Sequence, residues 1–108
     1  MIEIREYVDV LGRNFFERWL KKQDVMTRTR ISVALGRVEA GNLSAMKGIG
    51  AGLSEIRLNF GPGYRLYCGM DSDVLVILLG GGTKRRQQAD IEEAGLLWQE
   101  FKNRKGKK

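Results

Sequence analysis

The chain has 108 residues, of which 43% are hydrophobic, and a formal net charge of +6, which predicts one small basic domain with a modest core. A positive balance of this size favours a polyanionic partner, foremost nucleic acid, although charge also serves solubility. One cysteine and no histidine exclude an internal disulfide and argue against a zinc site or a Cys–His nucleophile.

The sequence predicts neither a targeting signal nor a membrane span. The N-terminus carries charges at Glu3, Arg5, Glu6 and Asp9, which is incompatible with a signal peptide. The longest purely apolar run, residues 74–79, is far too short to cross a bilayer. We therefore expect a cytoplasmic protein without a membrane partner.

The first forty residues predict a strand and then two helices. Apolar and charged residues alternate over residues 2–8, as in a half-buried strand. Phe16 and Trp19 have helical spacing, and Asp24 can cap a second helix over residues 24–40. Two short helices in succession indicate a helical hairpin laid against a sheet.

A β-hairpin is predicted in the middle of the chain. Two stretches of alternating apolar and polar residues flank the turn signal Gly61-Pro62-Gly63. If only these three residues form the loop, Asn59 faces Arg65 and Arg57 faces Tyr67. This register puts the polar residues of both strands on one side of the sheet.

The last part of the chain predicts a central strand and a helix. Residues 74–79 are apolar on both faces, which is typical of a strand covered on both sides, and we expect residues 80–82, all glycine, to end it. Residues 87–101 have helical spacing, and the lysine-rich tail 102–108 is expected to fray. The predicted fold class is α+β, in the order β-α-α-β-β-β-α, with helices packed on a small, mainly antiparallel sheet, as a single domain over residues 1–108.

Basic groups are concentrated on the hairpin and after the last strand. Arg57 and Arg65 are expected on one sheet face, outside the apolar set, and Lys84-Arg85-Arg86 follow the three glycines. Arginine suits phosphate because its planar fork makes bidentate contacts, and Tyr67 on the same face could stack on an RNA base. The same alternation is also typical of an ordinary solvated sheet face, and both interpretations remain open.

Two glycine-rich segments do not match known nucleotide-binding motifs. Residues 80–84 lack the spacing of a Walker motif, and residues 48–52 lack a surrounding βαβ unit, so we interpret both as loop glycines. Asp71 and Asp73 flank a predicted turn, where aspartate is common. We expect no metal site and no cofactor.

A series of short motifs runs from about Arg30 to Lys102. They are Arg30-Ile31, Gly41-Asn42, residues 47–57 (KGIGAGLSEIR), residues 61–67 (GPGYRLY), and residues 81–84 (GGTK) followed by Gln87 and Asp90-Ile91. In this order and near these spacings they resemble the addiction-module killer proteins, a HigB-like, phage-derived branch of the RelE/ParE superfamily. Two positions depart from that family, which commonly has a cysteine at the position of Gly80 and an acidic residue at that of Thr83.

The resemblance implies a RelE-like fold and the toxin of a type II toxin–antitoxin system. Its expected activity is translation arrest by a metal-independent endoribonuclease (mRNA interferase) that cleaves mRNA on the ribosome. The expected partner is a cognate antitoxin, a helix-turn-helix protein encoded beside it. Two alternatives remain: a ParE-like, non-enzymatic inhibitor of DNA gyrase, and a basic RNA-binding module without catalysis.

Carried over by motif, the catalytic candidates are Arg57, Arg65 and Lys84. RelE has a lysine at the position of Glu55, so the general base cannot be transferred. Glu55 is the only acid on the proposed face and is therefore a candidate base, although an ion pair with a neighbouring arginine is an equal alternative. The residues expected to contact RNA are Lys47, Tyr67, Arg85, Arg86 and Gln87.

Overall fold

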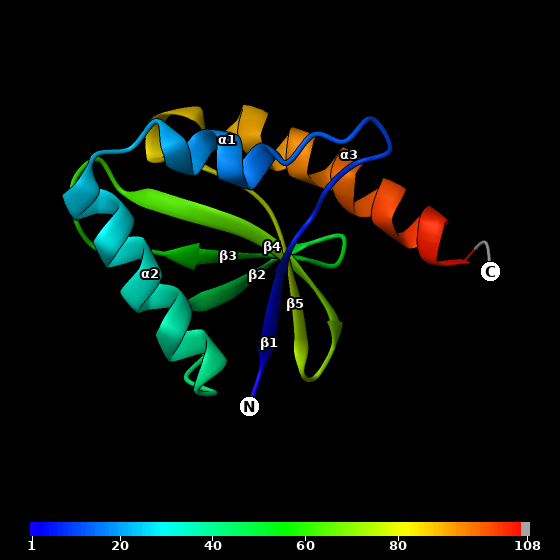
Figure 1. Ribbon diagram of the computed structural model, residues 1–108, viewed down its shortest axis with the longest axis horizontal. Coiled ribbons are helices and arrows are strands. Elements are labelled where there is room, and N and C mark those ends of the chain that lie inside the picture. Colours follow the sequence, from blue (N-terminus) through cyan, green and yellow to red (C-terminus); the bar gives the residue numbers. More distant parts are fainter. Residues whose placement is uncertain (107–108) are drawn as a thin grey trace.

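The computed structural model describes residues 1–106 and contains a five-stranded sheet with helices on both faces (Figure 1). The elements in chain order are β1 (Glu3–Glu6), α1 (Phe15–Lys21), α2 (Val25–Glu39), β2 (Met46–Gly50), β3 (Leu53–Arg57), β4 (Tyr64–Ser72), β5 (Leu75–Thr83), a short 3-10 turn (Lys84–Arg86) and α3 (Gln87–Gly106). The predicted α+β class is confirmed. Within residues 1–106, no helix combines the length and the apolar character needed to cross a membrane.

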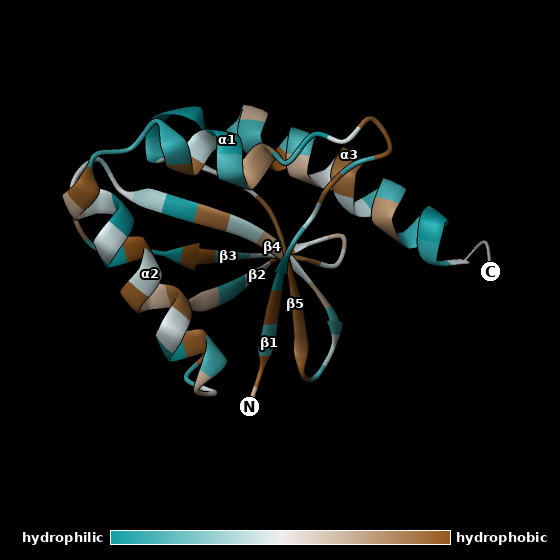
Figure 2. Ribbon diagram, viewed as in Figure 1, coloured by the Kyte–Doolittle hydropathy of each residue, from teal (hydrophilic) through white to brown (hydrophobic). Residues whose placement is uncertain are grey.

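The strands lie in the order β1-β5-β4-β3-β2. Only the β1–β5 pair is parallel, and the other three pairs are antiparallel. β5 therefore lies inside the sheet between β1 and β4, which confirms the central strand predicted from its apolar run. Figure 2 shows this run as brown residues along β5.

β2 is a strand that the sequence did not predict. It pairs with β3 at the edge of the sheet and contains Gly48 and Gly50, which are poor strand residues, so the segment was interpreted as a loop. The turn that follows is tight: the φ angles of Gly50, Ala51 and Gly52 are 95°, 55° and 80°. Left-handed backbone of this kind favours glycine, which explains the glycine-rich sequence.

The sheet separates two hydrophobic cores. Phe16 of α1 and Ile31 of α2 pack with Ile56, Leu66 and Leu78 on one face. On the other face, the buried residues that pack together are Leu53, Tyr67, Ile77, Leu79, Ala94, Leu97 and Trp98. Both faces of the hairpin strands are thus covered, one by α1 and α2 and the other by α3.

Residues 80–82 do not end β5 as predicted but continue it. A Cβ atom at Gly81 would lie 2.3 Å from Trp19 Cε3, and one at Gly82 would lie 1.9 Å from Asp90 Oδ2. Real Cβ atoms do not approach so closely, so these glycines let side chains from α1 and α3 rest directly on the strand. Their role is close packing rather than strand termination.

The lysine-rich tail, residues 102–108, was expected to fray, but α3 continues through most of it. Arg104 donates a hydrogen bond to the carbonyl oxygen of Val8 at 2.8 Å, and Lys105 forms an ion pair with β4. These contacts hold the last turns of the helix against the rest of the protein. Residues 107–108 lie outside the described residues.

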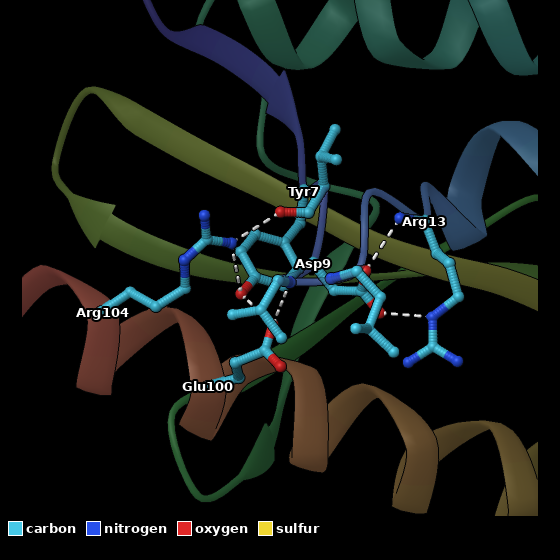
Figure 3. Close-up of polar contacts among 8 residues, drawn as sticks. Tyr7, Asp9, Arg13, Glu100 and Arg104 are labelled. Carbon is cyan, nitrogen blue, oxygen red and sulfur yellow. Dashed lines mark hydrogen bonds and ion pairs between the residues drawn. The ribbon is translucent and has the colours of Figure 1, made fainter.

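A polar network fixes α3 to the segment after β1 (Figure 3). The buried Tyr7 hydroxyl donates to Glu100 and accepts from Arg104 at 3.2 Å. Burial, and then the bond to Glu100, raise the pKa of Tyr7. Asp9 accepts bonds from Arg13 N at 2.8 Å and Arg13 Nε at 2.6 Å. Although burial opposes it, these bonds hold the pKa of Asp9 below its ordinary value.

Candidate functional site

The residues singled out on the hairpin lie on one face of the sheet. Lys47 on β2 pairs with Glu55 on β3, which pairs with Tyr67 on β4. Two residues further along β3, Arg57 pairs with Arg65. Directly opposed residues of antiparallel strands project to the same side, so all five belong to the face that α3 covers.

The hairpin register differs from the predicted one by two residues. Arg57 lies opposite Arg65 rather than Tyr67, and Leu58 N donates to Tyr64 O at 3.0 Å, so the loop comprises residues 59–63. A shift of two residues keeps every side chain on its face. The expected face was therefore correct, and the expected pairing was wrong.

Glu55 forms the centre of a buried polar cluster. Its carboxylate is fully buried and accepts a hydrogen bond from Arg57 Nε at 2.5 Å. Gln87 Nε2, from the first turn of α3, donates to its other oxygen at 3.2 Å, and Arg65 Nε lies 3.4 Å away. The carboxylate is therefore engaged by β3, β4 and α3. The ion pair expected as the alternative is present, and the burial of Glu55 favours it over the role of general base.

Arg65 and Tyr67 are buried, contrary to prediction. Arg65 is 8% exposed; its Nη1 donates to Gly63 O at 3.1 Å, and its Nε has no hydrogen-bond partner. Tyr67 is fully buried, and its hydroxyl also has no partner. Burial, with the nearby charges of Asp90 and Glu55, raises the pKa of Tyr67 to about 12. Because α3 covers this ring, the expectation that it stacks on a base is wrong.

The exposed basic groups lie at the margin of this cluster. The Arg57 side chain is 45% exposed, and Lys47 and Lys84 are also exposed. Lys84 is held near Arg65, because its backbone N–H donates to Gly63 O at 3.0 Å and the same carbonyl accepts from Arg65. Arg57 and Lys84 therefore offer two cations to a ligand at this margin.

Arg85 and Arg86 are exposed on the 3-10 turn after β5. Within residues 1–106, neither makes a hydrogen bond or ion pair with the cluster around Glu55. They lie beside Lys84 in the chain and extend its positive charge.

Asp90 belongs to a motif in the sequence but was not expected to be a site residue, and the structure places it in this region. Its Oδ2 atom is buried without a hydrogen-bond partner and lies against the backbone of Gly82. Burial raises the pKa of this carboxyl group, while the charge of Arg86 opposes the shift. The available signal was its spacing, three residues after Gln87 and therefore on the same side of α3.

The cluster around Glu55 is a set of buried ion pairs and hydrogen bonds with exposed basic residues at its margin, and it is not arranged to enclose a ligand. Across residues 1–106, no group of three or more histidine, cysteine, aspartate or glutamate side chains is arranged to hold a metal ion. What the arrangement can do is fix two guanidinium groups on one carboxylate and present cations to an anionic ligand.

No family model matches the chain. It is similar to an uncharacterized protein of Haemophilus influenzae (strain ATCC 51907 / DSM 11121 / KW20 / Rd), with 40% identity over 87 residues that cover 80% of this chain and 88% of that protein. The chain belongs to the family of this Haemophilus protein. That relative is itself uncharacterized, so the similarity assigns no function.

Proposed function

We propose that the chain is the toxin of a type II toxin–antitoxin system, in the HigB-like branch of the RelE/ParE superfamily, and that it arrests translation by cleaving mRNA. The observation that carries the proposal is the meeting of three separate motifs around Glu55. Glu55 and Arg57 come from β3, Arg65 from β4, and Gln87 from the start of α3. These are the segments on which the resemblance rests, and they assemble into one basic site.

The proposed reaction uses a nucleophile that RNA supplies. The 2′-hydroxyl gives up its proton to solvent water, and its oxygen attacks the adjacent phosphorus. The bond to the 5′-oxygen breaks, which leaves a 2′,3′-cyclic phosphate, and the 5′-oxygen takes up a proton to become a 5′-hydroxyl. Arg57 and Lys84 are exposed and contact the phosphoryl oxygens, whose charge increases in the transition state. Lys84 also aids the leaving oxygen. Glu55 acts as a positioning residue, because it holds the guanidinium groups of Arg57 and Arg65.

The ribosome is the proposed site of action. The chain has no histidine, the side chain best suited to proton transfer near neutral pH. Activity on free RNA is therefore expected to be weak, with the ribosome supplying the alignment of the 2′-hydroxyl. In this proposal the protein is cytoplasmic, and an adjacently encoded helix-turn-helix antitoxin inhibits it by covering the basic margin with an acidic segment.

The test is expression of the chain in host cells that lack the antitoxin. Radiolabelled amino-acid and thymidine incorporation are followed separately, with and without the neighbouring gene product. The proposal predicts loss of amino-acid incorporation, with rescue by the neighbour. Loss of thymidine incorporation alone would indicate a gyrase inhibitor instead, and normal growth of cells containing soluble protein would leave only an RNA-binding module.

A further inference from the structure

A basic groove lies between α2 and the end of the β3–β4 hairpin. It encloses about 600 Å³. Its polar and aromatic lining comes chiefly from Arg30 and Arg37 of α2, Arg57 at the end of β3, and Asn59 and Phe60 in the loop that follows. None of the motif-based site assignments except Arg57 extends into this groove.

The groove carries positive charge without a local counterion. Arg30 and Arg37 are exposed and lie seven residues apart, about two helical turns, so both project from the same side of α2. No aspartate or glutamate belongs to the lining among the described residues. In residues 1–106, neither arginine makes an ion pair. Such a surface is complementary to a ligand that carries several negative charges.

Arg30 is held in a defined position by an aromatic ring. Its Cζ atom lies 4.8 Å from the centroid of the Phe60 ring, and Phe60 in turn packs against Tyr64 at 5.3 Å. A cation–π contact uses none of the N–H donors of the guanidinium group, which stay able to bind phosphate. Arginine and aromatic side chains together are typical of surfaces that bind single-stranded nucleic acid.

The groove and the candidate site share one residue, Arg57. It belongs to the lining of the groove, and its Nε donates to Glu55 in the candidate site. We propose that the groove binds the single-stranded RNA that flanks the phosphate at the candidate site, with Arg30 and Arg37 each neutralising one backbone phosphate. This inference rests on the proposed function, because RNA is taken as the ligand. Every RNA nucleotide supplies both a phosphate and a base, whereas an acidic protein segment needs aromatic residues at suitable positions to use the same surface, so RNA is favoured.

The test measures binding separately from cleavage. The probe is a fluorescent 2′-O-methyl RNA of about ten nucleotides, which keeps the phosphates and bases but lacks the free 2′-hydroxyl that cleavage requires. Anisotropy titrations compare the full chain with Arg30→Ala/Arg37→Ala and with the matched control Arg18→Ala/Arg28→Ala, which removes two exposed arginines outside the groove lining. Arg37→Ala alone is a second variant that leaves the contact between Arg30 and Phe60 intact.

The groove variant should bind the probe about tenfold more weakly at about 100 mM salt. Its plot of log affinity against log salt should be less steep by about 1.4, the value for two lost phosphate contacts on a single strand. Arg37→Ala should show about half of that change in slope, and the control should match the parent.

Three results would overturn the inference. The first is that the parent and the groove variant bind the probe equally, and the second is that the parent does not bind it. The third is that the groove variant no longer co-purifies with the antitoxin but still binds the probe. RNA binding through the groove without cleavage in cells would leave the inference standing and reject the proposed function. Translation arrest together with equal probe binding would reject the inference alone.

Discussion

Replacement of Glu55 by alanine should be among the most damaging single changes at the candidate site. The substitution leaves Arg65, which is 8% exposed, without the carboxylate that lies 3.4 Å from its Nε. Removing one partner of a buried ion pair costs about 3–5 kcal/mol, because the other charge remains buried and uncompensated. Arg57→Ala removes the other cation, but that side chain is 45% exposed, so its loss should cost only about 1 kcal/mol or less.

The assay is equilibrium urea unfolding followed by the fluorescence of Trp19 and Trp98. Glu55→Ala should lower the free energy of unfolding by at least about 2 kcal/mol more than Arg57→Ala does. The double variant Glu55→Ala/Arg65→Ala should recover part of the loss, since it contains no unpaired buried charge, with a coupling energy of about 0.5–3 kcal/mol. Equal effects of Glu55→Ala and Arg57→Ala, within about 0.5 kcal/mol, would refute the reasoning.

Three further predictions concern packing, pH dependence and thiol reactivity. Gly69→Ala places a Cβ 2.5 Å from the Trp98 ring and should cost about 1–3 kcal/mol in urea unfolding; an unchanged midpoint would mean that α3 can move away freely. Hydrogen bonds from Thr27 lower the pKa of Asp24, so its stabilising effect is present above the ordinary value of 3.8 and is lost as pH falls through the lower folded-state value. Asp24→Asn keeps a capping oxygen and should flatten the unfolding free energy over that acidic range, whereas an identical pH profile would contradict this assignment. Burial raises the pKa of the Cys68 thiol to about 12, so a thiol reagent should modify it only when the protein unfolds, and rapid labelling of the native protein would show that the core is open.

Local signals in the sequence predicted most of the secondary structure. Asp24 caps α2 through Thr27 N at 2.8 Å as expected, and the apolar run in β5 identified a strand covered on both sides. β2 was missed because Gly48 and Gly50 have low strand propensity and their pairing with β3 is a tertiary contact. The predicted register of the hairpin was wrong because the length of a glycine-rich loop does not follow from its turn signal alone.

The sequence predicted which residues form the candidate site but not how deeply they are buried. Arg57, Arg65 and Gln87 were expected to lie together, but the burial of Arg65 was not expected. Alternation identifies which residues share a face, yet it cannot show that a distant helix covers that face. The charged residues of the hairpin predicted a solvent-exposed face, whereas Glu55 and Arg65 form an ion pair that is buried beneath α3.

The groove beside α2 could not be predicted from sequence at all. Arg30 and Arg37 belong to a helix whose other residues determine its packing, and Phe60 belongs to a loop. Only the folded chain brings these segments together. Functional surfaces of this kind depend on tertiary structure rather than on local pattern.

RNA cleavage at the candidate site is tested most directly by mapping RNA 5′ ends in cells that express the chain without its antitoxin. Lys84→Ala is the decisive variant, because Lys84 is exposed and its loss should change stability by only about 0.5 kcal/mol. Removal of one contact that stabilises transition-state charge slows a reaction by roughly a hundredfold or more. We expect new mRNA fragments with 5′-hydroxyl ends in cells with the parent chain and their loss with soluble, folded Lys84→Ala. The absence of such ends with the parent, or their persistence at full level with Lys84→Ala, would contradict this expectation.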